Sequence, residues 1–207
     1  MLNYNEMLEF VKKTLEQAST RKPDNPYHAF RDRYLHSYRV YKWMERIIDD
    51  LDVDKDVCYT AAIFHDVGYS VEKKNHALYS DMIFRRYAET HGFPKEFKER
   101  VSRCIALHSH KELLNNKDTM PELILLLEAD LLDEEGALGI AWDLLAMGAK
   151  GASDYKESIE ALKIHSGHIL SQDYMVTKKA KEYWEHKKEI VRGFIDELLS
   201  DLFIEEE

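Results

Sequence analysis

The chain has 207 residues but only eight glycines, four prolines and two cysteines. So few turn-forming residues argue against a β architecture built from many tight turns, and the abundance of Leu, Ala, Glu, Lys and Met favours helices. Cys58 and Cys104 each lie within an apolar helical pattern and form no close pair, which indicates a reduced protein without a disulfide framework. We therefore expect an all-α fold.

Long apolar runs and an excess of basic charge are also absent. No run approaches the length of a membrane span, and the first residues, MLNYNEMLEF, lack the basic flank and apolar core of a signal peptide, so we expect a cytoplasmic protein without a membrane partner. The formal net charge of −10 disfavours a nucleic acid polymer as partner. A small anionic ligand held by a local cation or metal stays compatible with this charge.

The apolar residues recur mainly with a helical period. The pattern predicts helices over 2–18, 27–51, 55–64, 76–90, 94–108 and from 121 onward, with a loop at 19–26 and two or three further helices between 134 and 203. Asp54, Asn75 and Thr177 are predicted caps, and Gly68 is expected to turn the chain after the third helix. No linker or repeat divides the sequence, so we expect one domain over 1–207.

Several histidines and carboxylates occur where this pattern predicts burial. In AAIFHDVGYS, at 61–70, His65 and Asp66 follow an apolar helix, and burying them without a partner would cost several kcal/mol. A bound metal would offset that cost. Imidazole and carboxylate ligands suit Mn, Fe, Co, Ni or Zn, and the absence of cysteine disfavours a thiolate zinc site. The candidate set is His36, His65, Asp66, His76, His108 and Asp130.

The local sequences around these residues carry a family resemblance. In order, DRYLHSYRV, FHDVGYS, NHALYSD, ALHSH and LEADLLDEEGALGIA resemble the HD-domain superfamily of metal-dependent phosphohydrolases. The resemblance implies an HD-domain helical fold, with a motif-bearing core at about 27–141 and additional C-terminal helices at about 142–207. The chain is most similar to small stand-alone bacterial HD hydrolases, some of which cleave nucleoside triphosphates to monophosphate and pyrophosphate.

The resemblance also implies ligands. It assigns His36, His65, Asp66 and Asp130 to a first divalent ion, and His76 and His108 to a second ion bridged by the aspartate of the HD pair. The cofactor would be one or two ions of Mn, Fe, Co, Ni, Mg or Zn. His76 and His108 have an alternative role as hydrogen-bond donors that orient a ligand carboxylate. Tyr69 occupies a position where some branches of the superfamily carry a glutamate or a lysine. The role of neither residue can be assigned to Tyr69.

The expected chemistry follows from these ligands. A divalent ion activates water and polarises a phosphoryl oxygen, and Asp66 or Asp130 would orient that water. Basic side chains close in sequence to the ligands are candidates for binding phosphate, with solvated surface charge as the alternative. These substrate-binding candidates are Arg33, Arg39, Lys73, Lys74 and His110.

The leading functional hypothesis is a phosphohydrolase acting on a small phosphorylated substrate, most plausibly a nucleotide. It would cleave a triphosphate to monophosphate and pyrophosphate, or a monophosphate to nucleoside. Two alternatives stay open: a dinuclear-iron HD oxygenase, and a non-catalytic nucleotide-binding or sensor module with a structural metal. The pair His165 and His168 has no acid or cysteine nearby, and we interpret it as surface or subunit contact. Amphipathic stretches near the C-terminus are compatible with a homodimer.

Overall fold

The computed structural model describes residues 2–18, 32–48, 51–152 and 154–204, and within these ranges the regular structure is helical, without a strand. The predicted all-α class is confirmed. The chain divides into two compact units, one formed by the described residues up to Asp133 and the other by those from Glu134 onward. The predicted loop at 19–26 and the start of the helix predicted from residue 27 lie outside the described residues.

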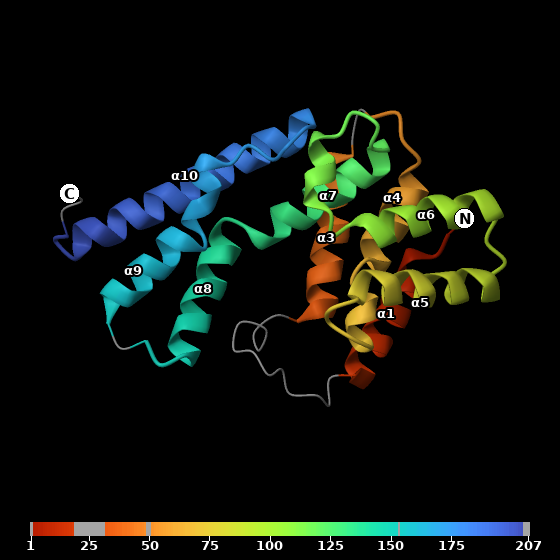
Figure 1. The fold of residues 1–207 in the computed structure, drawn as a ribbon, viewed down its shortest axis with the longest axis horizontal. Coiled ribbons are helices and arrows are strands. Elements are labelled where there is room, and N and C mark those ends of the chain that lie inside the picture. Colours follow the sequence, from red (N-terminus) through yellow and green to blue (C-terminus); the bar gives the residue numbers. More distant parts are fainter. Residues whose placement is uncertain (1, 19–31, 49–50, 153, 205–207) are drawn as a thin grey trace. The chain divides into compact units, whose positions relative to one another are not determined.

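The first unit is built around helix α4. Its helices are α1 (Tyr4–Ala18), α3 (Arg33–Ile47), α4 (Lys55–Phe64), α5 (His76–Thr90), α6 (Lys95–Leu107) and α7 (Pro121–Glu134), with short 3-10 helices η1 (Val67–Ser70) and η2 (Lys111–Asn115). Helix α4 packs against α1, α3, α5 and α6 (Figure 1). This central position fits the sequence, because α4 is apolar on nearly all sides.

The start of α4 is set by its predicted cap. The Asp54 carboxylate accepts hydrogen bonds from the backbone N–H groups of Asp56 and Val57, as expected for an N-cap. The other two predicted caps are only partly right. Asn75 and Thr177 do precede helices, but neither side chain makes a capping hydrogen bond. The amide of Asn75 donates to Glu72 instead.

Gly68 lets α5 approach the turn after α4. A Cβ at this position would lie 2.0 Å from the carbonyl oxygen of His76 and 2.5 Å from the backbone nitrogen of Ser80. The Gly68 N–H donates to Ser80 Oγ at 2.8 Å. Gly68 lies in η1, after the end of α4, and it is not one of the glycines with a left-handed φ, so it does not form a left-handed cap of α4. The absence of a side chain brings His76 close to the HD pair.

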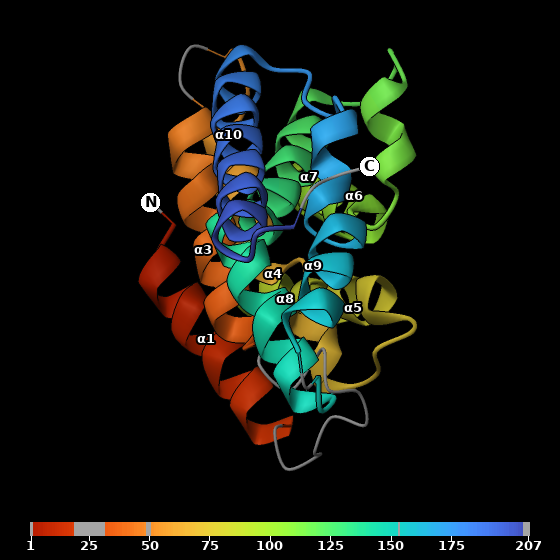
Figure 2. The same ribbon diagram turned by 90° about the vertical axis from the view of Figure 1, so that its left-hand side faces the viewer.

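The second unit contains α8 (Ala137–Ala149), α9 (Tyr155–Ile164), the 3-10 helix η3 (Gly167–Ser171) and α10 (Lys178–Asp201). Helix α10 packs against α8, α9 and η3, and Figure 2 shows these elements from the side. Trp184, Val191 and Ile195 are among the α10 residues that this packing buries. The prediction of two or three helices after residue 134 is confirmed.

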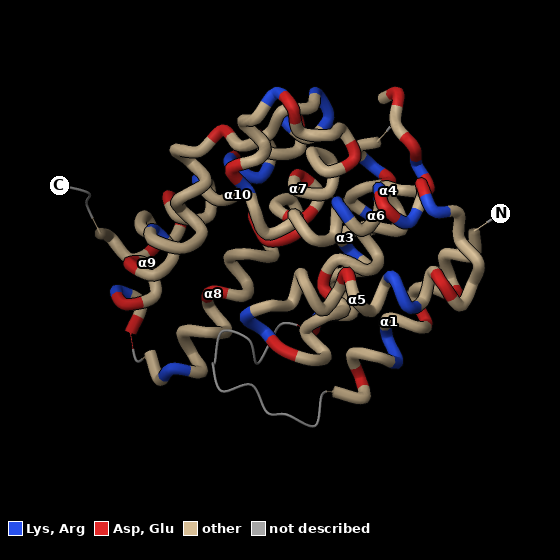
Figure 3. The backbone as a smooth tube through the Cα atoms, turned by 45° about the vertical axis from the view of Figure 1, so that its right-hand side comes forward, with Lys and Arg blue, Asp and Glu red and all other residues tan. Residues whose placement is uncertain are grey.

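Charged residues are spread along the helices of both units, with acidic and basic positions interspersed (Figure 3). The formal net charge of −10 is therefore distributed over many helices. Among the helices that the structure describes, none combines the length and the apolar character that crossing a membrane requires.

Candidate metal centre

The six candidate ligands come from separate helices of the first unit and meet in one place. They are His36 in α3, His65 and Asp66 at the end of α4, His76 at the start of α5, His108 at the end of α6 and Asp130 in α7. All are buried except His76, which is partly exposed. Distant parts of the sequence therefore bring four imidazoles and two carboxylates together.

Three of the histidines are each held by the backbone carbonyl group three residues earlier in the chain. The Nδ1 atoms of His65, His76 and His108 lie 2.8, 3.0 and 2.7 Å from the carbonyl oxygens of Ala62, Lys73 and Ile105. A carbonyl oxygen only accepts, so Nδ1 carries the hydrogen in each ring. Each neutral ring therefore presents an Nε2 lone pair, which is the atom that a metal binds.

His36 is held by a side chain instead. Its Nδ1 lies 2.7 Å from Asp133 Oδ2, and Arg39 donates to both oxygens of the same carboxylate at 2.7 and 2.9 Å. Asp133 is 2% exposed and His36 is 1% exposed, so this pair is buried, whereas the Arg39 side chain is 37% exposed. The carboxylate fixes the ring of His36 with Nε2 pointing away from Asp133.

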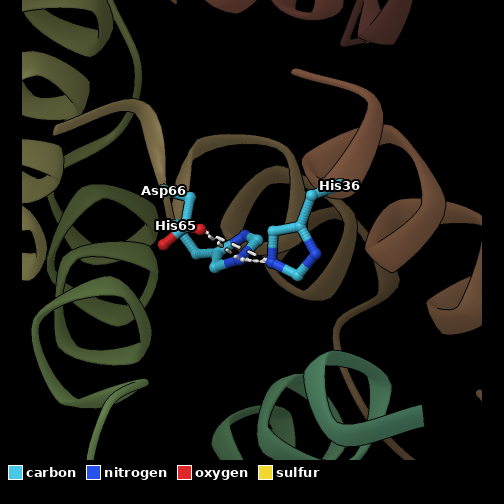
Figure 4. Close-up of side chains that lie close together, drawn as sticks. All are labelled: His36, His65 and Asp66. Atoms are coloured by element: carbon cyan, nitrogen blue, oxygen red, sulfur yellow. Dashed lines mark hydrogen bonds and ion pairs between the residues drawn. The ribbon is translucent and has the colours of Figure 1, made fainter. Parts of the chain in front are cut away.

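One histidine pair faces one oxygen of Asp66. The Nε2 atoms of His36 and His65 are 3.2 Å apart, and His36 Nε2 lies 3.4 Å from Asp66 Oδ2 (Figure 4). Asp130 adds a second carboxylate, with Oδ1 3.1 Å from His36 Nε2 and 3.8 Å from His65 Nε2. These four side chains are the set that the resemblance assigns to a first ion.

The other histidine pair faces the second oxygen of Asp66. The Nε2 atoms of His76 and His108 are 3.1 Å apart, and they lie 3.5 and 3.3 Å from Asp66 Oδ1. Ser109 Oγ lies 3.2 Å from His76 Nε2. Asp66 thus stands between two histidine pairs and offers a different oxygen to each.

The charge states of the group suit a cation. Burial lowers the pKa of His65 to about 4, so this ring is neutral at neutral pH. Burial raises the pKa of Asp66 and of Asp130, but neighbouring imidazoles with Arg33 and Lys111 outweigh it and hold both pKa values well below the usual range. Burial lowers the pKa of His36, but hydrogen bonds to Asp130 and Asp133 outweigh it and raise the pKa overall. Because a metal binds the deprotonated ligand, it would compete with a proton at His36.

The arrangement also gathers nitrogen and oxygen lone pairs at positions where a cation could bind them. Two Nε2 lone pairs that face each other at 3.1 or 3.2 Å repel unless a positive charge lies between them. Asp130 Oδ1 is buried and lies 3.1 Å from His36 Nε2, which can donate to it only when the His36 ring is protonated. An unsatisfied buried carboxylate oxygen is costly, and a divalent cation would remove both penalties. The residues present therefore fit a metal.

Two cationic side chains border the group. Arg33 Nη1 donates to Asp66 Oδ2 at 2.9 Å, and Lys111 Nζ donates to Asp130 Oδ2 at 2.5 Å. The Arg33 guanidinium also lies 3.7 Å from the centre of the Tyr69 ring, which in turn stacks on His76 with 4.3 Å between ring centres. Tyr69 thus positions both a cation and a candidate ligand.

The predicted phosphate-binding residues have different surroundings in the structure. The Arg33 side chain contacts a candidate ligand, because its guanidinium donates to Asp66. Arg39 is bound to Asp133, and His110 pairs with the exposed Glu112 at 2.9 Å. Lys73 and Lys74 are exposed, and Lys73 contributes its backbone carbonyl to hold His76.

Sequence reasoning missed Lys111 and Asp133. Lys111 follows His108 by three residues, so the proximity that singled out His110 pointed equally to Lys111. Asp133 follows Asp130 by three residues, a spacing that places both on one face of a helix. That spacing was the available signal for a second carboxylate directed at the same site.

The HD domain family matches residues 33–135 of the chain, a range that contains all six candidate ligands. The chain belongs to the HD-domain family. The predicted resemblance is confirmed, and the helices after residue 135 are additional to the matched domain. No curated protein matches the chain significantly.

Solved structures share the fold over nearly the whole chain. The Lin1889 protein from Listeria innocua is 23% identical, with a TM-score of 0.67 and coverage of 99% of this chain and 100% of its own. YpgQ from Bacillus subtilis, in complex with ADP, is 24% identical, with a TM-score of 0.67 and coverage of 96% and 94%. A predicted HD superfamily hydrolase from an uncultured Thermotogales bacterium is 20% identical, with a TM-score of 0.66 and coverage of 96% and 92%.

Proposed function

We propose that this HD-domain protein is a metal-dependent phosphohydrolase that acts on a nucleotide. The observation that carries the proposal is the convergence of four Nε2 lone pairs on the two oxygens of one ionised aspartate, Asp66. Such a donor set has little use in a protein core without a cation. The nucleotide part is supported by the similar YpgQ protein, whose structure contains ADP.

Each candidate ligand would bind one of two ions, except Asp66, which would bind both. His36, His65, Asp130 and Oδ2 of Asp66 would hold one ion, and His76, His108 and Oδ1 of Asp66 would hold a second. A divalent ion in such a site lowers the pKa of bound water toward ~7 and polarises a phosphoryl oxygen. The hydrogen bonds at Nδ1 keep the four rings oriented throughout.

The remaining chemistry belongs to side chains of the protein. Asp66 or Asp130 would orient the attacking water by accepting a hydrogen bond from it. The water oxygen bonds to phosphorus as the phosphorus–oxygen bond to the leaving group breaks. Lys111 and Arg33 are positioned to pair with phosphate oxygens, because both already bind carboxylates that border the site.

A nucleotide panel tests the proposal. Purified protein is analysed for bound elements and then incubated with nucleoside mono- and triphosphates in the presence of Mn²⁺, Co²⁺, Mg²⁺ or Ni²⁺. Phosphorus NMR of the products distinguishes a triphosphate cleaved to monophosphate and pyrophosphate, our first expectation, from a monophosphate cleaved to nucleoside. Turnover that is equally fast after complete metal removal would contradict the proposal.

Two variants of the HD pair sharpen this test. We expect His65→Ala and Asp66→Ala to lose bound metal and hydrolysis together while keeping the helical circular dichroism spectrum. The matched control is His186→Ala, because His186 is an exposed histidine of α10 that pairs with Glu189. Control protein that loses activity to the same extent, or Asp66→Ala protein that retains it, would refute the assignment.

A further inference from the structure

A second group of titratable side chains surrounds a cavity in the second unit. The cavity has a volume of about 370 Å³ and lies among the start of α8, the end of α9 and η3. Its lining includes Glu135, Trp142, Asp143, His165, Ser166 and His168. The acids that the sequence did not place near His165 and His168 therefore do lie beside them. None of these side chains takes part in the proposed hydrolysis.

Local contacts hold the lining in place. Ser166 Oγ donates to Asp143 Oδ2 at 2.6 Å, and both residues are buried. Lys187 Nζ, from α10, donates to the backbone carbonyl of Glu135 at 2.8 Å. At Gly139 a Cβ would lie 2.8 Å from the carbonyl oxygen of Glu134, so a glycine is needed where α8 passes this turn. These contacts hold Asp143, the backbone of Glu135 and the start of α8 in place around the cavity.

The carboxyl group of Glu135 lacks a strong partner. Its side chain is only 10% exposed, and His168 Nε2 lies 3.4 Å from Oε1. Burial raises the pKa of Glu135 to about 8 and the Asp143 carboxylate adds to this, whereas Lys187 lowers it. Burial raises the pKa of Asp143 as well, against the effects of Ser166, His165 and His168. Two buried acids therefore line one cavity together with His165 and His168.

The chemistry of the lining residues limits the kinds of ligand that the cavity could bind. Its charged side chains include three acids, Glu134, Glu135 and Asp143, and neither lysine nor arginine is among the lining residues. An acidic lining repels phosphate and other anions. The volume falls in the range of small-molecule sites, and the indole of Trp142 offers an apolar face of the kind that attracts organic cations.

A bare metal ion fits less well than an organic cation. None of the groups of donor atoms that lie close enough to hold a metal, among the described residues, includes Glu135, Asp143, His165 or His168. A larger ligand that carries its own N–H donors spans such distances. We propose that this cavity binds a small protonated amine, which donates hydrogen bonds to Asp143 and Glu135 and lays its carbon chain against Trp142.

Binding of the amine is coupled to a proton. The ligand needs the ionised form of Glu135, so the carboxyl group releases its proton to solvent when the ammonium group binds. Affinity is then expected to rise about tenfold per pH unit as the pH increases toward about 8, and to level off above it. The other ionisable groups that face Glu135 are Asp143 from α8, His168 from η3 and Lys187 from α10.

Isothermal titration calorimetry with 1,4-diaminobutane tests this proposal on the full chain, with 1,4-butanediol as the uncharged probe of similar length. We expect saturable binding of the diamine and none of the diol. Titrations in buffers of different ionisation enthalpy should report proton release near neutral pH. Absence of diamine binding at millimolar concentration, or equal binding of the diol, would overturn the proposal.

Variants of the lining residues test whether the diamine binds in this cavity. Asp143→Asn is expected to weaken diamine binding at least tenfold, since it removes a charge but keeps an oxygen for Ser166. Glu135→Gln should abolish the proton release and the pH dependence, and it serves as the second test if Asp143→Asn does not fold. Glu189→Gln, on the exposed side of α10, is the matched control. Unchanged binding and proton release in Glu135→Gln protein would refute the assignment.

Discussion

The carboxylate behind His36 offers the sharpest test of the metal centre. In Asp133→Asn protein, the amide has one oxygen for three donors, namely His36 Nδ1 and the two Arg39 groups that now share the carboxylate. Whichever way the amide turns, an NH₂ group faces another donor. If it faces His36, the ring must move its hydrogen from Nδ1 to Nε2 and can no longer bind a metal through Nε2.

The expected loss can be estimated. Replacing a group that orients a metal-binding histidine costs about 10- to 100-fold in metal affinity, or about 1.4–2.8 kcal/mol. The substitution is also expected to lower the free energy of unfolding by about 1–3 kcal/mol, because a buried carboxylate that accepts three hydrogen bonds is replaced. Metal affinity is measured by competition with a chromophoric chelator for Co²⁺, and stability by urea denaturation.

The control separates the two effects. Glu122 is another buried acid of α7, and it pairs with an arginine, Arg100, that is not part of the candidate metal centre. Glu122→Gln should therefore destabilise the fold by a comparable amount and leave Co²⁺ affinity unchanged. If Asp133→Asn protein binds Co²⁺ as tightly as the wild type, the carboxylate does not orient His36 toward a metal and the reasoning fails.

Three further predictions address the fold, a buried acid and metal removal. Gly68→Ala should lower the free energy of unfolding in urea by about 3 kcal/mol, because its Cβ would overlap the His76 carbonyl, whereas Gly148→Ala, with open space around its Cβ, should not destabilise. The pKa of Glu135 rises from 4.5 to about 8 on folding, so the free energy of unfolding of the wild type falls as the pH rises through this window. Glu135→Gln protein should therefore be about 2–4 kcal/mol more stable than the wild type at about pH 9, and the two proteins should be equally stable at about pH 4. A chelator should lower the melting temperature, and Mn²⁺ at about 100 times its Kd should restore about 2.7 kcal/mol in the wild type but not in Asp66→Ala protein. Parallel curves for Glu135→Gln and wild type, or a chelator effect that persists in Asp66→Ala, would count against these interpretations.

Much of the helical framework could be predicted because its signals are local. The helices at 55–64 and 76–90 have the predicted bounds, and Asp54 caps the first of them as expected. Periodicity and capping depend on neighbours in the sequence, so a single chain contains them. The capping hydrogen bonds expected of Asn75 and Thr177 are absent, since the structure around a helix start decides where such a side chain turns.

The candidate site could be predicted only in its list of residues. The sequence indicated which histidines and acids are buried, but the pairing of Arg39 with Asp133 joins α3 to α7, and no local pattern encodes that contact. His110 and Lys111 follow His108 by two and three residues, so sequence distance did not separate them, but Lys111 binds Asp130 whereas His110 pairs with Glu112. Gly68 was identified as a turn residue, but the groups that a Cβ there would meet belong to the next helix.

The way the histidines are held has a consequence for sequence variation. His65, His76 and His108 are anchored on main-chain carbonyls, which every amino acid provides, so residues 62, 73 and 105 are free to change without misdirecting a ring. His36 depends on a side chain, and residue 133 has no such freedom. The carbonyl anchors place no demand on the side chains at 62, 73 and 105, although Ala62 and Ile105 are buried and must still pack in the core. An engineer who transplants this centre into another helical scaffold therefore needs to carry along one supporting side chain, that of Asp133, rather than four.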